Sequence, residues 1–253
     1  MAMLNRFFES RRGTVAVSAI PPGHRVYAVG DIHGRLDLLD RLIALIDADD
    51  AAKEPVDTTL IFLGDVVDRG PNSAGVVHRL RELQRDRLST RLLLGNHEEI
   101  FLAALTGEQQ AVRTFCRVGG RETLISYGVT ELEYERMDYN DVAAALVDLV
   151  PRADREFVRN FTDMIVLGDY AFVHAGIDPA IPLSEQQSHS LRWIRQPFLT
   201  YRGEFEKVIV HGHTIHHGVE MSRNRIGIDT GAYQTGRLSA ICLEGTERHV
   251  IQT

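Results

Sequence analysis

The feature that most constrains the fold is a regular alternation of strand-like and helix-like segments in the first hundred residues. Runs rich in apolar residues at 26–29, 60–63 and 91–94 are each followed at once by a glycine and a polar residue. Between them, residues 35–46 place leucine and isoleucine on one helical face, and residues 73–83 also have a helical pattern. Strands that alternate with helices are joined by crossovers, so this order predicts a parallel sheet.

The second half of the chain has a different organisation. Residues 99–163 are mostly helical and charged in character, which predicts a helical insert or cap. Short strand signals then follow at 165–167, 170–173, 208–210, 226–228, 239–243 and 249–252. Because no linker rich in glycine, serine or proline separates the halves, we predict a single domain over residues 21–253. We expect residues 1–20 to form a flexible N-terminal arm, and residues 47–57 to form an acidic loop.

Composition excludes several classes of protein. The 253 residues carry 28 Lys and Arg against 35 Asp and Glu, a formal net charge of -7. Proteins that bind nucleic acids generally or dock on membranes use a basic surface, so we expect neither partner. The sequence also lacks an apolar run of the length that crosses a bilayer, and we predict a cytoplasmic protein. Bound metal ions would add positive charge that this count does not include.

Cysteine and histidine usage indicate what could bind a metal. The two cysteines, Cys116 and Cys242, lie far apart and outside any CxxC motif, so a disulfide framework is excluded and a thiolate zinc site is disfavoured. We interpret both cysteines as small apolar core residues and His249 as an ordinary non-ligand histidine. Eleven histidines are present, so a metal site would be built from imidazole and carboxylate groups.

Clusters of polar residues follow five of the predicted strands. They are Gly30–Gly34, Gly64–Gly70, Gly95–Glu98, His174–Gly176 and His211–Thr214. Each cluster alone has an ordinary interpretation as a turn, a helix cap or a core histidine. Together they offer carboxylate, imidazole and amide oxygen, the ligands of hard and borderline divalent metals. Ligand sites in α/β sheets lie beyond the carboxyl ends of the strands, so we predict one metal site at that edge.

These motifs resemble the calcineurin-like metallophosphoesterase superfamily, and specifically its phosphoprotein phosphatase branch. They read GDIHG at 30–34, GDVVDRG at 64–70, GNHE at 95–98, HAG at 174–176 and a late GHT at 212–214. Two further segments, 119–128 and 228–233, are similar to bacterial members of that branch. The resemblance implies an α/β fold, a sandwich of two mixed β-sheets flanked by helices, with residues 99–163 as a helical cap.

The same resemblance implies a ligand set for two divalent metal ions. The implied ligands are Asp31, His33, Asp65, Asn96, His174 and His213. Asp31 and His33 would bind the first ion, and Asp65 would bridge both. We expect manganese, with iron or zinc as alternatives, because this donor set suits all three. The superfamily often ends in GHxH, but Ile215 follows Thr214 here, so the last ligand of that longer motif is absent.

The remaining implied roles concern the reaction. His97 would be the general acid, held by Asp68, and Arg69 would contact phosphate oxygens together with Asn96. A second phosphate-binding arginine is matched best by Arg195. Arg192 is the rival for this role. We expect His211 to lie behind the metal ligands or to face the substrate. We expect Glu98 to be a structural partner at a helix start. The implied step is in-line attack by a hydroxide that bridges the two metals.

Several functions remain open after these assignments. The favoured one is a bacterial serine/threonine-type protein phosphatase, a monomer that acts on phosphorylated proteins or peptides. The first alternative is a symmetrical dinucleoside tetraphosphatase, a group that typically has alanine where Asp68 stands and GNHD where residues 95–98 stand. A phosphotyrosine or broad-specificity phosphatase acting on small phosphate esters is a further alternative. The non-enzymatic alternative is a catalytically silent scaffold that binds metal.

Overall fold

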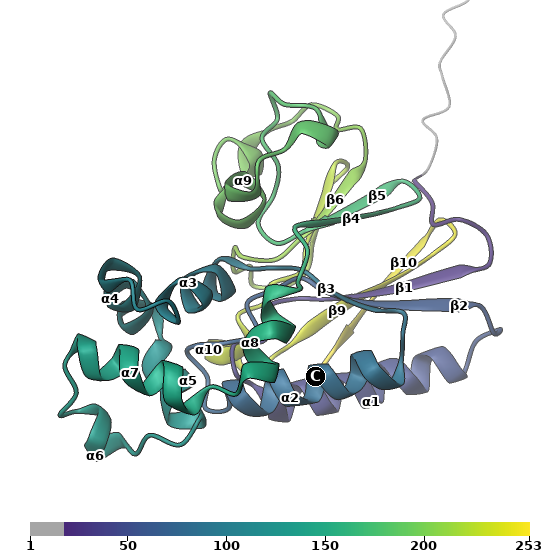
Figure 1. Cartoon of the computed structure of the whole chain (residues 1–253). Coiled ribbons are helices and arrows are strands. Elements are labelled where there is room, and N and C mark those ends of the chain that lie inside the picture. Colours follow the sequence, from purple (N-terminus) through teal and green to yellow (C-terminus); the bar gives the residue numbers. More distant parts are fainter. Residues whose placement is uncertain (1–17) are drawn as a thin grey trace, which may run out of the picture.

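The computed structural model describes residues 18–253, and its framework is two facing β-sheets (Figure 1). Within the described residues, the first sheet has five strands. In spatial order they are β10 (Glu247–Gln252), β9 (Ser239–Glu244), β1 (His24–Val29), β2 (Asp57–Phe62) and β3 (Thr90–Leu92). The second sheet contains β4 (Met164–Leu167), β5 (Tyr170–Val173), β6 (Val208–His211), β8 (Arg225–Gly227) and β7 (Glu220–Met221). Both sheets are mixed, as expected.

Parallel pairing within each sheet places the polar clusters at common edges. In the first sheet, β1 pairs in parallel with β2, and β2 with β3. In the second sheet, β5 pairs in parallel with β6, and β6 with β8. Antiparallel strands complete the sheets, with β9 beside β1, and β4 beside β5. Each parallel strand therefore delivers the segment that follows it to the same end of its sheet.

Helices cover the outer face of the first sheet and gather at one end of the molecule. The long helices α1 (Leu36–Ala51) and α2 (Ser73–Asp86) run along the sheet (Figure 1). Consecutive helices then occupy residues 96–159, close to the predicted helical region. They are α3 (Asn96–Ala104), α4 (Gln109–Val118), α5 (Gly120–Ser126), α6 (Glu131–Tyr134), α7 (Tyr139–Leu149) and α8 (Arg152–Arg159). The later helical elements are η1 (Leu183–Glu185), α9 (Ser188–Trp193), η2 (Phe198–Thr200) and α10 (Ala232–Thr235).

The alternation of side chains along the strands builds separate apolar layers. On β1, Val26 and Ala28 face the second sheet, where they join buried residues such as Phe172. Tyr27 and Val29 face the opposite way, into the layer beneath α1 and α2. A third cluster covers the outer face of the second sheet. The molecule therefore has four layers: helices, the first sheet, the second sheet and loops. The polar clusters lie at the edges of the two sheets.

Two sequence predictions need correction or restriction. The acidic loop begins later than expected, because α1 continues to Ala51. Residues 1–17 of the expected N-terminal arm lie outside the described residues, and the arm's last residues are not loose. Ile20 is buried between the sheets, where its N–H donates to the carbonyl of Gly245 at 2.8 Å. Along residues 18–253, we find no helix that combines the length and the apolar character needed to cross a membrane.

Candidate metal centre

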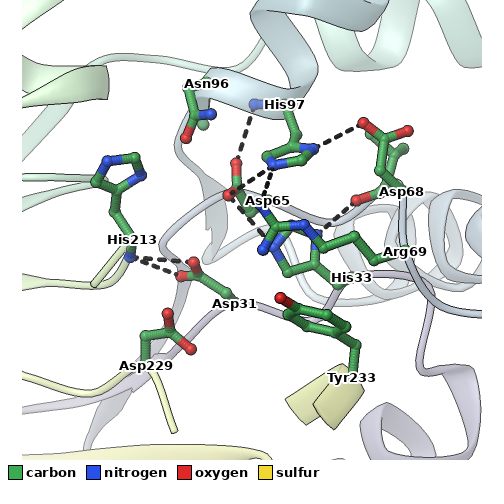
Figure 2. A network of polar contacts seen from close by, with 12 residues as sticks. Asp31, His33, Asp65, Asp68, Arg69, Asn96, His97, His213, Asp229 and Tyr233 are labelled. Atoms are coloured by element: carbon green, nitrogen blue, oxygen red, sulfur yellow. Dashed lines mark hydrogen bonds and ion pairs between the residues drawn. The ribbon is translucent and has the colours of Figure 1, made fainter. Parts of the chain in front are cut away.

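The predicted polar clusters meet at the edge where the two sheets face each other (Figure 2). Asp31 and His33 follow β1, and Asp65 follows β2. Asn96 and His97 open α3 just after β3, while His174 follows β5 and His213 follows β6. All of these side chains are buried. Segments separated by up to 182 residues thus supply one site. This agrees with the prediction made from the position of each motif after a strand.

Asp65 lies at the centre of the cluster. Its Oδ2 atom is 3.5 Å from Nε2 of His33, and its Oδ1 atom is 3.4 Å from Nε2 of His174. Two groups of possible metal ligands therefore share this carboxylate, one with His33 and His97, the other with His174 and His213. Burial alone would raise the pKa of Asp65, but the neighbouring histidines, which become charged at acidic pH, hold it well below its ordinary value.

The histidines around Asp65 present unprotonated nitrogens to the cluster. The Nδ1 atom of His33 lies 2.8 Å from the carbonyl of Val67, and Nδ1 of His174 lies 2.8 Å from the carbonyl of Leu63. A carbonyl only accepts, so each Nδ1 carries the proton. Burial lowers the pKa of His33 to about 3 and lowers the pKa of His174, which keeps both rings neutral. Each Nε2 therefore carries a free lone pair, the form that binds metal.

Two details show that the residues fit divalent cations. The unprotonated Nε2 of His174 faces Oδ1 of Asn96 at 3.0 Å, so two acceptors point at each other. The Nε2 atom of His213 is buried and has no hydrogen-bond partner, although unpaired buried polar atoms are rare in folded proteins. A cation held by these atoms would satisfy all of them at once, as the chemistry of the donor set allows.

Asp31 belongs to the same centre and has an acidic neighbour that the sequence analysis did not assign. Both carboxylate oxygens of Asp31 accept the backbone N–H of His213, at 3.0 and 3.2 Å. Burial, together with the nearby Asp229 and Asp65 carboxylates, raises the pKa of Asp31. Burial also raises the pKa of Asp229 to about 6. Metal binding beside Asp31 would offset this concentration of negative charge.

His97 stands beside the candidate ligands and is held by a buried carboxylate. Its Nδ1 atom lies 2.7 Å from Oδ2 of Asp68. The other oxygen of Asp68 accepts the hydroxyl of Thr123 at 2.7 Å. Burial would lower the pKa of His97, but the Asp65 and Asp68 carboxylates outweigh it and raise that pKa. Thr123 lies in the segment 119–128 that resembled bacterial phosphatases, although its role could not be read from sequence.

Arginines line the mouth of the site. Arg69 places a guanidinium nitrogen 2.8 Å from Nε2 of His97, and its guanidinium lies 4.8 Å from the ring centroid of Tyr233. Arg195 donates to the carbonyl of His213 at 3.4 Å, so it reaches the metal cluster. Arg192 instead pairs with Asp163 at 2.7 Å. Arg195 thus lies on the His213 side of the site, whereas Arg192 is engaged by Asp163. Tyr233 joins the residues that the sequence analysis did not assign.

Glu98 organises the loop that carries Asp65. Its Oε2 atom accepts the N–H groups of Asp65 and Gly95, at 2.7 and 3.0 Å. Its Oε1 atom accepts those of Val66 and Val67, at 2.8 and 3.2 Å. One buried carboxylate thus satisfies four backbone donors, the structural role at a helix start that the sequence predicts for it.

Close backbone approach explains two glycines of the motifs. A Cβ atom at Gly212 would lie 2.1 Å from Oδ1 of Asp31, and one at Gly95 would lie 2.2 Å from Oδ1 of Asp65. His211 lies behind this contact. Its Nδ1 atom is 3.0 Å from the carbonyl of Gly212, and its ring packs edge-on against Phe198 with centroids 5.0 Å apart.

A two-sheet sandwich with carboxylates and histidines converging at one edge defines a metallophosphoesterase. The sequence profile described as calcineurin-like phosphoesterase matches residues 24–240. This chain therefore belongs to the calcineurin-like phosphoesterase family, a family that implies divalent metal ions in the site.

Curated relatives and solved structures refine the comparison. The chain is 32% identical over 184 residues to a symmetrical bis(5'-nucleosyl)-tetraphosphatase of Acidovorax ebreus, covering 73% of this chain and 51% of the relative. It is 30% identical over 187 residues to one of Methylococcus capsulatus, covering 74% and 51%. The match thus spans about half the length of these relatives. A crystal structure of a protein provisionally named a diadenosine tetraphosphatase has a TM-score of 0.63 at 22% identity, covering 94% of this chain and 98% of that one. The last similarity shows the fold alone. These names differ from the protein phosphatase branch that the motifs favoured.

Proposed function

We propose that this protein is a two-metal hydrolase that cleaves a bond between phosphorus and oxygen in an anionic substrate. The observation that carries the proposal is the Asp65 carboxylate, which is shared between the His33 group and the His174–His213 group. We assign the first ion to Asp31, His33 and Asp65. The second would be held by Asp65 with Asn96, His174 and His213. Bound divalent ions would supply Lewis acidity and lower the pKa of a bound water molecule to about 7.

The chain's own residues would bind the phosphate and handle a proton. Arg69 lies between His97 and Tyr233, and Arg195 approaches from the side of His213. The two guanidinium groups would contact phosphate oxygens beside the metals. Their positive charge would let an acidic protein bind an anion. Asp68 fixes the Nδ1–H of His97, and Nε2 accepts from Arg69 in this structure. Once Arg69 turns to a phosphate oxygen, Nε2 would be free to hold a proton for the leaving oxygen. We propose the helical segment as a cap, since Thr123 from α5 supports Asp68.

For the substrate, we favour a symmetrical dinucleoside tetraphosphate. The support comes from the relatives, whose printed names are symmetrical bis(5'-nucleosyl)-tetraphosphatase. A groove of about 840 Å³ also adjoins the phosphate-binding residues, lined by Arg35, Arg69, Asn72 and Tyr233 among others. Such a groove has room for more than a phosphate group, and the Tyr233 ring offers an aromatic surface for a nucleoside.

A second candidate is a phosphomonoesterase that acts on phosphoserine or phosphothreonine. The observation that favours it is the 2.7 Å contact between His97 and Asp68. A serine or threonine alkoxide leaves only when it is protonated, whereas a nucleoside diphosphate is a stable leaving anion. A carboxylate-supported acid therefore matters most for the monoester, and tetraphosphatases typically have alanine where Asp68 stands.

One activity panel with manganese tests both candidates. The substrates are diadenosine tetraphosphate and peptides bearing phosphoserine, phosphothreonine or phosphotyrosine. We expect cleavage of the tetraphosphate to two molecules of ADP, and loss of this activity in Asp65→Asn. Asp57→Asn, at an exposed position at the start of β2 and so at the opposite end of that strand from Asp65, is the control and should keep it.

Asp68→Ala separates the two substrate classes. If the tetraphosphate is the substrate, Asp68→Ala should reduce its cleavage much less than it reduces any cleavage of the phosphoserine peptide. Preference for phosphopeptides over the tetraphosphate would overturn the first candidate in favour of the second. No cleavage of any substrate, with no difference in Asp65→Asn, would indicate a metal-binding scaffold.

A further inference from the structure

A second cluster with metal-binding chemistry lies far from the phosphoesterase site. Asp49 is near the end of α1, Cys242 is on β9 and His249 is on β10, and potential ligand atoms of the three lie within 4.8 Å of one another. Asp49 comes thirteen residues after Leu36, where α1 leaves the first metal-ligand loop. At 1.5 Å per residue, about 20 Å of helix separates the two sites.

The ammonium of Lys53 marks the point on which this cluster converges. Its Nζ atom is 2.8 Å from Oδ2 of Asp49, 3.3 Å from Nε2 of His249 and 3.5 Å from Sγ of Cys242. The hydroxyl of Tyr27 donates to the same Asp49 oxygen at 2.6 Å. A carboxylate, an imidazole nitrogen and a sulfur atom thus surround one position that already holds a positive charge.

The donor set and its exposure suit zinc. Sulfur, nitrogen and oxygen donors together are typical of Zn²⁺, which binds with three protein ligands and leaves a fourth position for water. Cys242 is buried, whereas the side chain of His249 is 40% exposed and gives access from solvent. The Lys53 side chain is 28% exposed, so its flexible stem can carry the ammonium out into water.

We propose that Asp49, Cys242 and His249 bind one zinc ion in place of the Lys53 ammonium. On binding, the thiol of Cys242 becomes a thiolate and its proton passes to solvent, while Lys53 keeps its charge. The ion links α1 to the β9–β10 hairpin, and β9 pairs directly with β1, the strand that leads to Asp31. The sequence disfavoured such a site because the two cysteines, Cys116 and Cys242, lie far apart and outside any CxxC motif.

Cobalt absorption tests the proposal without interference from the phosphoesterase site. The probe is Co²⁺, added to the full chain after loading with manganese. A Co²⁺–thiolate bond gives a near-ultraviolet charge-transfer band, and the candidate ligands of the phosphoesterase site include no cysteine. We expect a band that saturates at one cobalt per chain and disappears when zinc is added.

Variants assign the band to these residues. Cys242→Ser should abolish it, His249→Gln should weaken binding, and Cys116→Ser, the matched control, should leave it unchanged. Lys53→Met should bind cobalt about fivefold more tightly, because a part-exposed ion pair no longer competes. Absence of the band in the parent protein, or its persistence in Cys242→Ser, would overturn the proposal. Because His249 is at the surface, its variant keeps the test valid if Cys242→Ser does not fold, and an unchanged affinity there would also overturn it.

Discussion

The buried Glu98 carboxylate provides a test of how the loop carrying Asp65 is held. Replacing it by glutamine conserves size but exchanges one acceptor oxygen for an NH₂ group. Whichever way the amide turns, two backbone N–H groups then face a donor. They are either those of Asp65 and Gly95 or those of Val66 and Val67.

The expected cost follows from these contacts. Burial raises the pKa of Glu98 to about 7, so the carboxylate is charged only above that pH. There, a hydrogen bond to a charged group contributes about 1.5–3 kcal/mol to stability, so loss of two gives about 3–6 kcal/mol. The two remaining bonds also weaken, because their acceptor becomes neutral. Typical domains unfold with only about 5–15 kcal/mol, so Glu98→Gln should lose a large part of the total.

The measurement is the free energy of unfolding in urea, with the slope compared between variants to confirm a common unfolding transition. Glu99→Gln is the matched control, because Glu99 is part-exposed, accepts one hydrogen bond from Nε1 of Trp193 at 2.9 Å and forms a part-exposed ion pair with Arg192 at 3.4 Å. Its amide oxygen can keep that bond, so the loss should stay below about 1 kcal/mol. Equal losses in the two variants would refute the inference that Glu98 holds the loop.

Three other changes have defined outcomes. Thr123→Val removes the hydroxyl that binds Asp68, so turnover should fall while metal content per chain, measured by elemental analysis, stays constant. His97→Ala should lower turnover by about 10²–10⁴-fold and leave two metals per chain, and loss of metal would mean that His97 is a ligand. Phe172→Ala empties a fully buried position between the sheets and should cost about 3–5 kcal/mol in thermal or urea unfolding.

Much of the fold could be predicted because its signals are local. The strand at Tyr170–Val173 and the start of α2 at Ser73 agree with their apolar patterns. The two-residue strand β7 was missed, since Glu220 and Met221 are too few to show alternation. The end of α1 also differs from the prediction, because the acidic residues between alanines suggest a loop but continue the helix to Ala51.

The candidate site shows the same limit more clearly. Residues in short glycine-flanked motifs, such as Asp31 and His213, could be predicted to meet because parallel strands end at one edge. Thr123 could not, because a threonine in a helix carries no signal until the fold places it against Asp68. Likewise, only the pairing of β9 with β10 brings Cys242 beside His249.

Backbone conformation gives a further constraint on the site. Over residues 18–253, the non-glycine residues with left-handed backbone are His33, Asp65, Asp68, Arg69 and His213. All of them lie in the candidate site, and each such conformation costs about 1–2 kcal/mol. Five together would cost about 5–10 kcal/mol, as much as a typical domain's whole stability. Interactions such as those of Glu98 must hold these loops in place.

Arg69, with a φ of 69°, allows this strain to be measured. Arg69→Gly and Arg69→Ala both delete the guanidinium, but only glycine adopts the left-handed conformation without penalty. Glycine also gains more freedom in the unfolded chain, which offsets part of that relief. Arg69→Gly should therefore unfold with a free energy about 1 kcal/mol higher than Arg69→Ala. Equal stability, or a more stable alanine variant, would show that the left-handed conformation at Arg69 is not strained.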